Sequence, residues 1–462
     1  MIIANLALVF AGKIPVNLNL TVSREAAEAS LLLAGIGEIV TAGPVRALFP
    51  KYPWLATTRD IAADLGALSK VRLAAALLAV WTVPGRWLTS IFAIASEGSD
   101  REALLLFTSG SSGDPKGVPL THTNIIANVT QVFITELVTS QDRILGCLPL
   151  FHSFGSTFTL WTPLLRDVGL VTTPSPLDAA KVGAAVAAGQ ATLLLGTPTF
   201  LRAYARKVAP AEFASLRLAV AGAEKLPADL ATLYREKYRV EIIEGYGLTE
   251  TSPVLAANLP NPRRGFAAES EQIAHREGSV GRLFPGIAHR FADPETGHPI
   301  ETPQAGLLQV KGANIFGGYL DDPAKTGEVL HDGWFTTGDL ARIDDDGFLF
   351  IEGRLSRFAK IGGEMVPLAK IEEIAIRTLG LTAEQGPAAA LIALPHPTKG
   401  EELIFLSVEP VEKERLRHKL IEAGLPNLWI PRMVRQVSAI PLLGTGKIDW
   451  RGCRKLVETV LV

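Results

Sequence analysis

The stretch Phe107-Thr-Ser-Gly-Ser-Ser-Gly-Asp-Pro-Lys-Gly-Val118 indicates what kind of fold surrounds it. A leucine-rich run precedes it, and a helical pattern begins near Thr121. Glycines let a backbone approach a polyanion closely, while hydroxyl and N–H groups donate to phosphate oxygens and Lys116 adds positive charge. The spacing differs from the nucleotide-binding pattern GxxxxGK[ST], because Lys116 precedes Gly117. The stretch predicts a phosphate-binding loop rather than a flexible linker, with contacts from Thr108, Ser109, Gly110, Ser111, Ser112, Gly113 and Lys116.

Around this loop, short apolar runs alternate with longer helical patterns. The runs at 143–150, 191–198 and 216–224 are rich in leucine, isoleucine and valine, and helical patterns cover 124–137 and 200–208. Alternation of this kind indicates α/β layers with mostly parallel strands.

Near residue 278 the pattern changes to glycine-punctuated strands with turns such as Asp344-Asp-Asp-Gly347. This run lacks the alternating ligands of a calcium loop, so we interpret it as a hairpin turn. We expect an α/β protein with a large N-terminal domain over 1–353, whose layered α/β subdomains are followed by a β-rich subdomain at about 278–353. A small, mobile α+β domain over 354–462 completes the predicted architecture.

The composition excludes several classes of protein. The 462 residues include 48% hydrophobic and 20% charged side chains. Lys+Arg 45 nearly balance Asp+Glu 47, so the protein has no overall positive electrostatic field that would attract nucleic acid. Cys147 and Cys453 are far apart and form no CxxC pair, which favours a reducing compartment over a disulfide or zinc framework. We therefore expect a cytoplasmic protein.

Two apolar stretches bear on membrane contact. Residues 1–19 lack the basic start of a signal peptide, so we expect a core helix that runs into a strand. Residues 73–95 are interrupted by Pro84-Gly-Arg86, whereas spanning a bilayer needs about 20 unbroken apolar residues. We expect a buried helix there. The alternative is a helix on the membrane surface, which Trp81, Arg86 and Trp87 would suit and which would place the protein at the inner face of the membrane.

Further segments follow the loop in a fixed order. They are Glu244-Gly-Tyr-Gly-Leu-Thr-Glu250, Thr337-Gly-Asp339, Gly353-Arg354, Lys360-Ile-Gly-Gly-Glu364 and Pro441-Leu-Leu-Gly-Thr-Gly-Lys447. Together with the loop they resemble the adenylate-forming superfamily, which includes acyl-CoA synthetases, peptide-synthetase adenylation domains and firefly luciferase.

The resemblance implies a binding site for ATP and Mg²⁺. Asp339 would accept hydrogen bonds from the ribose hydroxyls with support from Arg354, and Glu250 would provide a hard oxygen for Mg²⁺. Tyr246 would contact the adenine face and Thr249 the phosphate. The remaining nucleotide-binding residues implied are Gly222, Ala223, Glu224, Gly245 and Gly247.

The resemblance also assigns the mobile parts and the acyl path. Lys447 would enter the site and neutralise charge at the α-phosphate, while the small domain reorients about Arg354 and Ser356. His152 would gate the carboxylate pocket; a packed or capping histidine is the alternative. The residues implied to line the acyl path are Phe151, His152, Phe154 and Gly155. The catalytic set is Lys447, Thr249, Glu250 and His152.

Finer features resemble one branch of the superfamily. The stretch Arg357-Phe-Ala-Lys-Ile-Gly-Gly-Glu-Met-Val366, in which Met365 replaces a common arginine, is similar to the acyl-acyl-carrier-protein synthetase module of bifunctional 2-acylglycerophosphoethanolamine acyltransferases. This implies a fatty acid substrate and transfer to a phosphopantetheine thiol of acyl-carrier protein. A CoA or aryl-acid ligase remains the alternative. The histidine–aspartate signature of the acyltransferase half is missing, so a separate acyltransferase would be a partner.

The start of the chain departs from the family pattern. The stretch at 4–19 resembles a segment that lies well inside the first subdomain of relatives. We therefore expect the family's first helices and strands to be missing, supplied by another polypeptide, lost from this sequence or dispensable in this branch. A non-catalytic binding module is a further alternative, which the intact Lys447, Glu250 and Asp339 disfavour.

Overall fold

The computed structural model describes most of the chain. The described residues are 1–94, 98–109, 115–261, 273–301, 304–362, 364–382, 387–396, 400–442 and 448–458. The predicted phosphate contacts Gly110, Ser111, Ser112 and Gly113, and the predicted catalytic Lys447, lie outside them.

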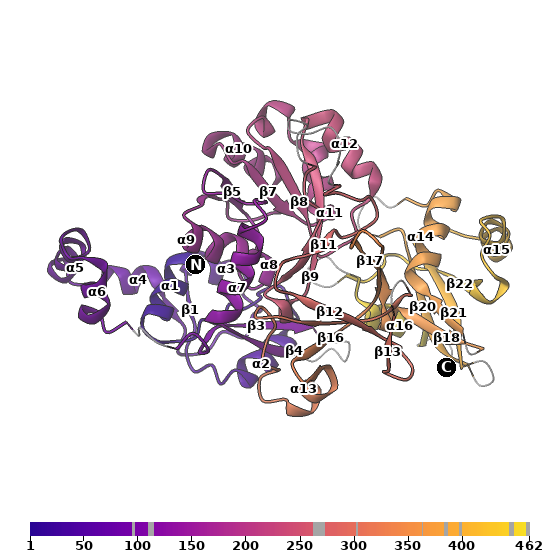
Figure 1. Cartoon of the computed structure of the whole chain (residues 1–462), viewed down its shortest axis with the longest axis horizontal. Helices are drawn as coiled ribbons and strands as arrows, with labels where there is room; N and C mark the ends of the chain where they lie inside the picture. Colours follow the sequence, from indigo (N-terminus) through magenta and orange to yellow (C-terminus); the bar gives the residue numbers. More distant parts are fainter. Residues whose placement is uncertain are drawn as a thin grey trace.

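A seven-stranded sheet organises the large unit (Figure 1). Its spatial order is β11-β10-β9-β8-β7-β5-β6, and β5 to β9 pair in parallel, which confirms the predicted α/β layers. The strands are β5 Arg143–Gly146, β6 Gly169–Thr172, β7 Leu193–Gly196, β8 Leu218–Ala221, β9 Glu241–Gly247, β10 Val254–Ala257 and β11 Arg282–Leu283. The helices between them are α8 Ser153–Gly155, α9 Thr162–Arg166, α10 Ala179–Gly189, α11 Pro198–Lys207 and α12 Ala228–Tyr238.

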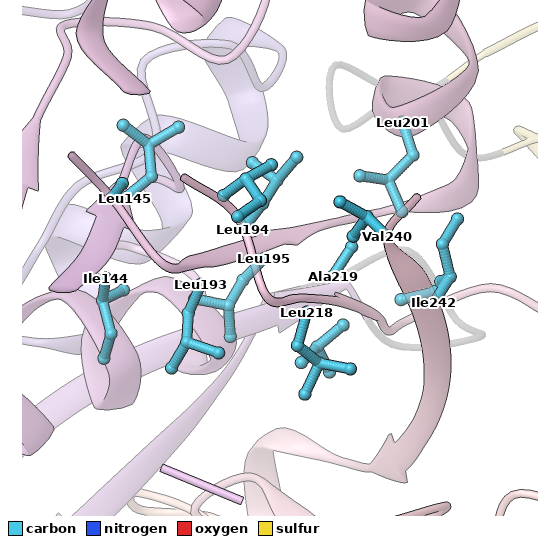
Figure 2. Packing of buried hydrophobic residues seen from close by; sticks show 14 of the residues in the cluster. Ile144, Leu145, Leu193, Leu194, Leu195, Leu201, Leu218, Ala219, Val240 and Ile242 are labelled. Atoms are coloured by element: carbon cyan, nitrogen blue, oxygen red, sulfur yellow. The ribbon is translucent and has the colours of Figure 1, made fainter. Parts of the chain in front are cut away.

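The core of this unit lies on both faces of the parallel strands. All four residues of β7 and of β8 are buried, which explains why these strands have apolar runs instead of alternation. Figure 2 shows Leu194 and Ala219 of the strands beside Leu201 of α11.

The glycine-rich loop joins the two strands of a hairpin, β3 Glu102–Ser109 and β4 Pro115–Thr121. The sequence predicted the first strand and the following helix, α7 His122–Phe133, but not β4. Thr121 caps α7 through a reciprocal pair of hydrogen bonds with Asn124, 3.1 and 3.0 Å. The hairpin register places Thr108 opposite Lys116, so both lie at the mouth of the loop.

The β-rich part forms a second sheet. It runs β13-β12-β14-β16-β15, with β17 on the other edge of β16, and its pairings are antiparallel. The strands are β12 Ala288–Ala292, β13 Pro299–Ile300, β14 Gly306–Lys311, β15 Leu330–His331, β16 Trp334–Ile343 and β17 Leu349–Arg354, and α13 is Pro323–Val329. The predicted turn between β16 and β17 is confirmed, because Gly347 N donates to Asp344 O at 2.9 Å.

A five-stranded sheet with three helices follows β17 and forms the small unit, which begins after Arg354. The part of the chain before it is the large unit. Its order is β19-β18-β21-β20, with β22 beside β21. The strands are β18 Phe358–Ile361, β19 Glu364–Pro367, β20 Ala389–His396, β21 Gly400–Ser407 and β22 Met433–Gln436; the helices are α14 Leu368–Leu379, α15 Lys413–Glu422 and α16 Trp450–Glu458. Each hydrophobic cluster of the described residues lies wholly before or wholly after Arg354.

The first hundred residues correct two expectations. Their elements are α1 Ile2–Phe10, α2 Arg24–Leu33, β1 Val40–Thr41, α3 Gly43–Leu48, β2 Arg59–Asp60, α4 Ile61–Gly66, α5 Lys70–Thr82 and α6 Gly85–Ile91. The helix α1 forms as predicted, but its buried residue is Asn5, and the expected strand after it reduces to an isolated bridge from Val16 to Leu105. The expected buried helix at 73–95 is wrong, since no residue of α5 or α6 is buried. An apolar run alone does not say whether a partner covers it.

Candidate active site

The predicted site residues gather where parallel strands end. In open α/β sheets, ligands bind outside the carboxyl ends of the strands, because consecutive strand–helix connections open there. His152 follows β5, Gly222 follows β8, and Tyr246 and Gly247 end β9. Residues that are up to about a hundred positions apart in the sequence thus lie together at the carboxyl end of the sheet.

A buried carboxylate, Asp339, lies at the junction of the two sheets. The Tyr246 hydroxyl donates to its Oδ2 at 2.5 Å, and Nε of Arg354 donates to its Oδ1 at 3.2 Å. Asp339 and Arg354 are direct cross-strand partners on β16 and β17, which explains how the sequence holds them together. The side chain of Asp339 is 4% exposed and that of Arg354 is 60% exposed.

Burial governs the protonation of this cluster. It raises the pKa of Asp339, while Arg354 and the Tyr246 hydroxyl act in the opposite direction. The pKa of Tyr246 is also raised, by burial first and then by the adjacent Asp339. Tyr246 therefore stays a hydrogen-bond donor. The predicted partners Asp339 and Arg354 are brought together, and Tyr246 joins them through its hydroxyl, a contact that the sequence did not indicate.

A second carboxylate, Glu250, sits in a short 3₁₀ turn after β9. Its Oε1 accepts a hydrogen bond from the Tyr319 hydroxyl at 2.9 Å, and its backbone carbonyl accepts from Phe316 N at 2.9 Å. The Lys116 ammonium lies over the Tyr319 ring, 4.8 Å from its centroid. Tyr319 therefore links the predicted metal ligand to the predicted phosphate lysine.

Sequence reasoning missed Tyr319. It follows Gly317-Gly318 in a segment that carried only turn signals, so no pattern distinguished it. Burial and the neighbouring Glu250 carboxylate raise the pKa of Tyr319, so the phenol remains protonated and donates.

The segment after β5 brings its predicted acyl-path residues to the same edge. His152 caps α8, with Phe154 N donating to its Nδ1 at 3.3 Å, so the capping role applies in this structure. Ser153 Oγ lies 3.3 Å from Thr249 Oγ1 and ties the segment to the Glu250 turn. Phe154 packs against Gly222, where an added Cβ would stand 3.1 Å from the ring.

Other predicted residues lie at the edges of the site. Phe151 is half-buried, whereas Ala223 is exposed with a φ of 68°. Glu224 accepts a hydrogen bond from Thr199 Oγ1 at 2.8 Å, which ties the turn after β8 to the start of α11. Gly245 is a half-buried β9 residue. Thr108 and Lys116 flank the loop, and Ser109 contributes the last backbone position of β3.

Glu244 is a half-buried carboxyl that sequence reasoning did not single out. Leu226 N donates to its Oε1 at 3.2 Å. Burial raises the pKa of Glu244 to about 7, although this hydrogen bond and Lys225 favour the charged form. The group therefore titrates near neutrality, close to the turn that follows β8.

The segment between the two units is anchored on both sides. Arg354 binds Asp339 in the large unit, while Arg357 binds Glu372 at 2.9 Å and stacks 3.4 Å from the Trp450 ring centroid in the small unit. Ser356 lies between these anchors. Leu442 and Ile448, which flank the segment that contains Lys447 in the sequence, form an isolated antiparallel bridge.

Comparison with known proteins gives consistent matches. The family model described as AMP-binding enzyme matches residues 1–320. The chain is 32% identical over 359 residues to feruloyl-CoA synthase of an Amycolatopsis species, covering 76% of this chain and 69% of that protein. It is 28% identical over 364 residues to the mitochondrial medium-chain acyl-CoA ligase of Mus musculus, covering 76% of this chain and 57% of that protein. The ATP-bound crystal structure of MatB from Rhodopseudomonas palustris superposes with a TM-score of 0.80 at 26% identity, covering 99% of this chain and 86% of that one.

Proposed function

Because the chain belongs to the AMP-binding enzyme family, we propose that it is an ATP-dependent acid–thiol ligase that makes an acyl-CoA through an acyl-adenylate. Its relatives include CoA ligases for aryl and aliphatic acids, so a carboxylic acid is the substrate class and CoA is the favoured thiol. This replaces acyl-carrier protein as the first choice.

The observation that carries the proposal is the pair of buried carboxylates, Asp339 and Glu250, next to the end of β9. Asp339, with its donors Tyr246 and Arg354, offers the acceptor that ribose hydroxyls need. Glu250 has one oxygen on Tyr319, and a carboxylate plus substrate phosphates is how Mg²⁺ is commonly bound. Bound Mg²⁺ would neutralise phosphate charge.

The chemistry proceeds in two steps. The acid's carboxylate oxygen bonds to the α-phosphorus of ATP, and the bond to pyrophosphate breaks. Lys116 and Lys447 would balance the charge that develops on the phosphates. The small unit then reorients about Ser356, the thiol sulfur bonds to the acyl carbon and loses its proton, and AMP leaves.

Pyrophosphate exchange tests the proposal directly. Purified protein should exchange labelled pyrophosphate into ATP only when a suitable carboxylic acid is present. A panel of aryl, short, medium and long-chain acids identifies the class. Asp339→Ala should lose the exchange because the ribose acceptor is gone. If folded protein neither binds ATP nor supports exchange with any acid, a non-catalytic binding module becomes the better description.

Acyl-carrier protein remains a second candidate thiol. The stretch from Arg357 to Val366, with Met365 in β19, resembles the carrier-protein branch. Mass spectrometry of products formed with CoA, or with phosphopantetheinylated carrier protein, separates the two thiols. A fatty acid substrate together with carrier-protein transfer would also support a separate acyltransferase as partner.

A further inference from the structure

The helices α5 and α6 form an apolar projection at the end of the molecule opposite the five-stranded sheet (Figure 1). Neither helix contains a buried residue. Val71 is 79%, Leu78 64% and Trp81 87% exposed, values that single hydrophobic residues reach but contiguous groups rarely do. The other large exposed side chains of the projection are Leu73, Leu77, Val80, Trp87, Ile91 and Phe92.

The arrangement of small and large residues gives the projection an orientation. The half-buried positions of α5 are Ala76 and Ala79, whereas its leucines, valines and Trp81 are exposed. The half-buried positions of α5 thus carry only small side chains, and its bulky apolar side chains remain exposed to solvent. A helix whose larger apolar face is uncovered calls for an apolar partner.

The charge of the projection is of one sign. From Ser69 to Ile94 the sequence contains Lys70, Arg72 and Arg86 and no aspartate or glutamate. All three cations are exposed. A surface that combines apolar bulk, two tryptophans and positive charge matches the boundary of an anionic lipid bilayer, where the rings sit among headgroups.

We propose that α5 and α6 bind the surface of a bilayer that contains anionic phospholipid. The inference depends on no part of the proposed ligase activity. With 13 residues, α5 is about 20 Å long, short of the ~30 Å hydrocarbon core, so it lies on the membrane. Among the described residues, no helix combines the length and apolarity needed to cross a bilayer.

A second copy of the chain fits this surface less well. A two-fold interface would pair the projection with itself and bring Lys70, Arg72 and Arg86 toward their own copies without an acidic partner within the projection. Anionic headgroups supply that partner, and their attraction falls as salt rises.

Vesicle flotation of the whole chain tests the proposal. The protein should float with vesicles of phosphatidylcholine mixed with phosphatidylglycerol, and much less with phosphatidylcholine alone or at high salt. The double variant Leu77→Glu/Leu78→Glu should weaken partitioning at least about tenfold. Changing Lys70, Arg72 and Arg86 to Gln should weaken it about fivefold per cation. Leu177→Glu, which is 79% exposed but outside the projection, should bind as wild type does.

The measurements separate the outcomes. Circular dichroism and thermal unfolding check that each variant is folded. If the Leu77→Glu/Leu78→Glu variant (the Glu variant) is unfolded, the variant with Lys70, Arg72 and Arg86 changed to Gln (the Gln variant) provides the test. The proposal is overturned if the wild-type protein does not float with anionic vesicles. It is also overturned if the Glu variant and the Gln variant both float as well as the wild type. A stable dimer that Leu77→Glu/Leu78→Glu dissociates, without vesicle binding by the wild type, assigns the surface to a second copy and also overturns it.

Discussion

Tyr319 contacts two groups on which the proposed site depends. Its hydroxyl donates to Glu250, and its ring lies under Lys116. A phenylalanine would keep the ring and remove only the hydrogen bond to the carboxylate.

Tyr319→Phe should lower ATP–pyrophosphate exchange about tenfold or more, because a hydrogen bond to a charged group contributes about 1.5–3 kcal/mol. The loss should shrink at high Mg²⁺ if the phenol positions Glu250 for the metal. Tyr238→Phe is the matched control, since that hydroxyl donates to the Val208 carbonyl at 2.9 Å inside the fold. Equal activity of the Tyr319→Phe variant and wild type at all Mg²⁺ concentrations would contradict this role.

Glu244 should make stability depend on pH. Its pKa is about 7 in the folded protein against 4.5 for the free group, so the folded state favours the protonated carboxyl. That contribution is complete below about pH 4.5 and is lost as pH rises through about 7. A shift of this size corresponds to about 3 kcal/mol.

Glu244→Gln keeps an acceptor for Leu226 N and cannot ionise. Denaturant unfolding between pH 5 and 8 should show wild type losing stability relative to the variant as pH rises. Parallel pH profiles for the two proteins would show that the carboxyl is not shifted.

At the scale of elements, close backbone approaches shape the segment that carries His152. Gly155 ends α8 where an added Cβ would overlap the carbonyl of Pro149. The chain therefore folds back tightly before the π-helix Ser156–Trp161, whose residues are all buried.

Gly155→Ala should destabilise the protein by about 1–3 kcal/mol, because the backbone must shift to remove the overlap. Gly66→Ala in α4 is the matched control, since an added Cβ there meets nothing within 4 Å and a helical alanine should be neutral or stabilising by up to about 1 kcal/mol. Denaturant midpoints measure both. An unchanged midpoint for Gly155→Ala would show that the segment relaxes freely.

Element prediction succeeded where a continuous apolar run or a capping residue marks the element. The apolar runs became β5, β7 and β8, and the Thr121 cap marks the start of α7. The strand β4 was missed because Pro115 and Gly117 are weak strand formers, and it is the pairing with β3 that makes it a strand.

At the scale of the whole molecule, weak contacts join the two units. The ion pairs Lys225–Glu373 at 3.1 Å and Lys360–Glu295 at 2.8 Å both connect exposed side chains. Exposed pairs contribute at most about 1 kcal/mol each, so they oppose reorientation only slightly.

Lys447→Ala should affect adenylation and leave thioester formation intact, because Lys447 would reach the site in only one of the two orientations of the small unit. Adenylation should fall about 10²-fold or more, because a preorganised cation at the phosphate is lost. Thioester formation from supplied acyl-adenylate should be retained, since that step would use the reoriented small unit. Lys413→Ala, at the start of α15, is the control and should affect neither step. An equal loss in both half-reactions would count against the proposed role.

The sequence by itself determined the α/β class and the order of the segments that carry Glu250, Asp339 and Arg354, and it predicted a nucleotide-binding role for them, because these inferences depend on residue type and spacing along the chain. Tertiary structure decided which groups meet: the Tyr246 hydroxyl on Asp339, Tyr319 between Glu250 and Lys116, and the burial that shifts the pKa of Glu244. It also decided that α5 and α6 remain uncovered. Contacts and burial depend on segments that are distant in sequence, and a local sequence pattern does not specify which distant segment packs against it.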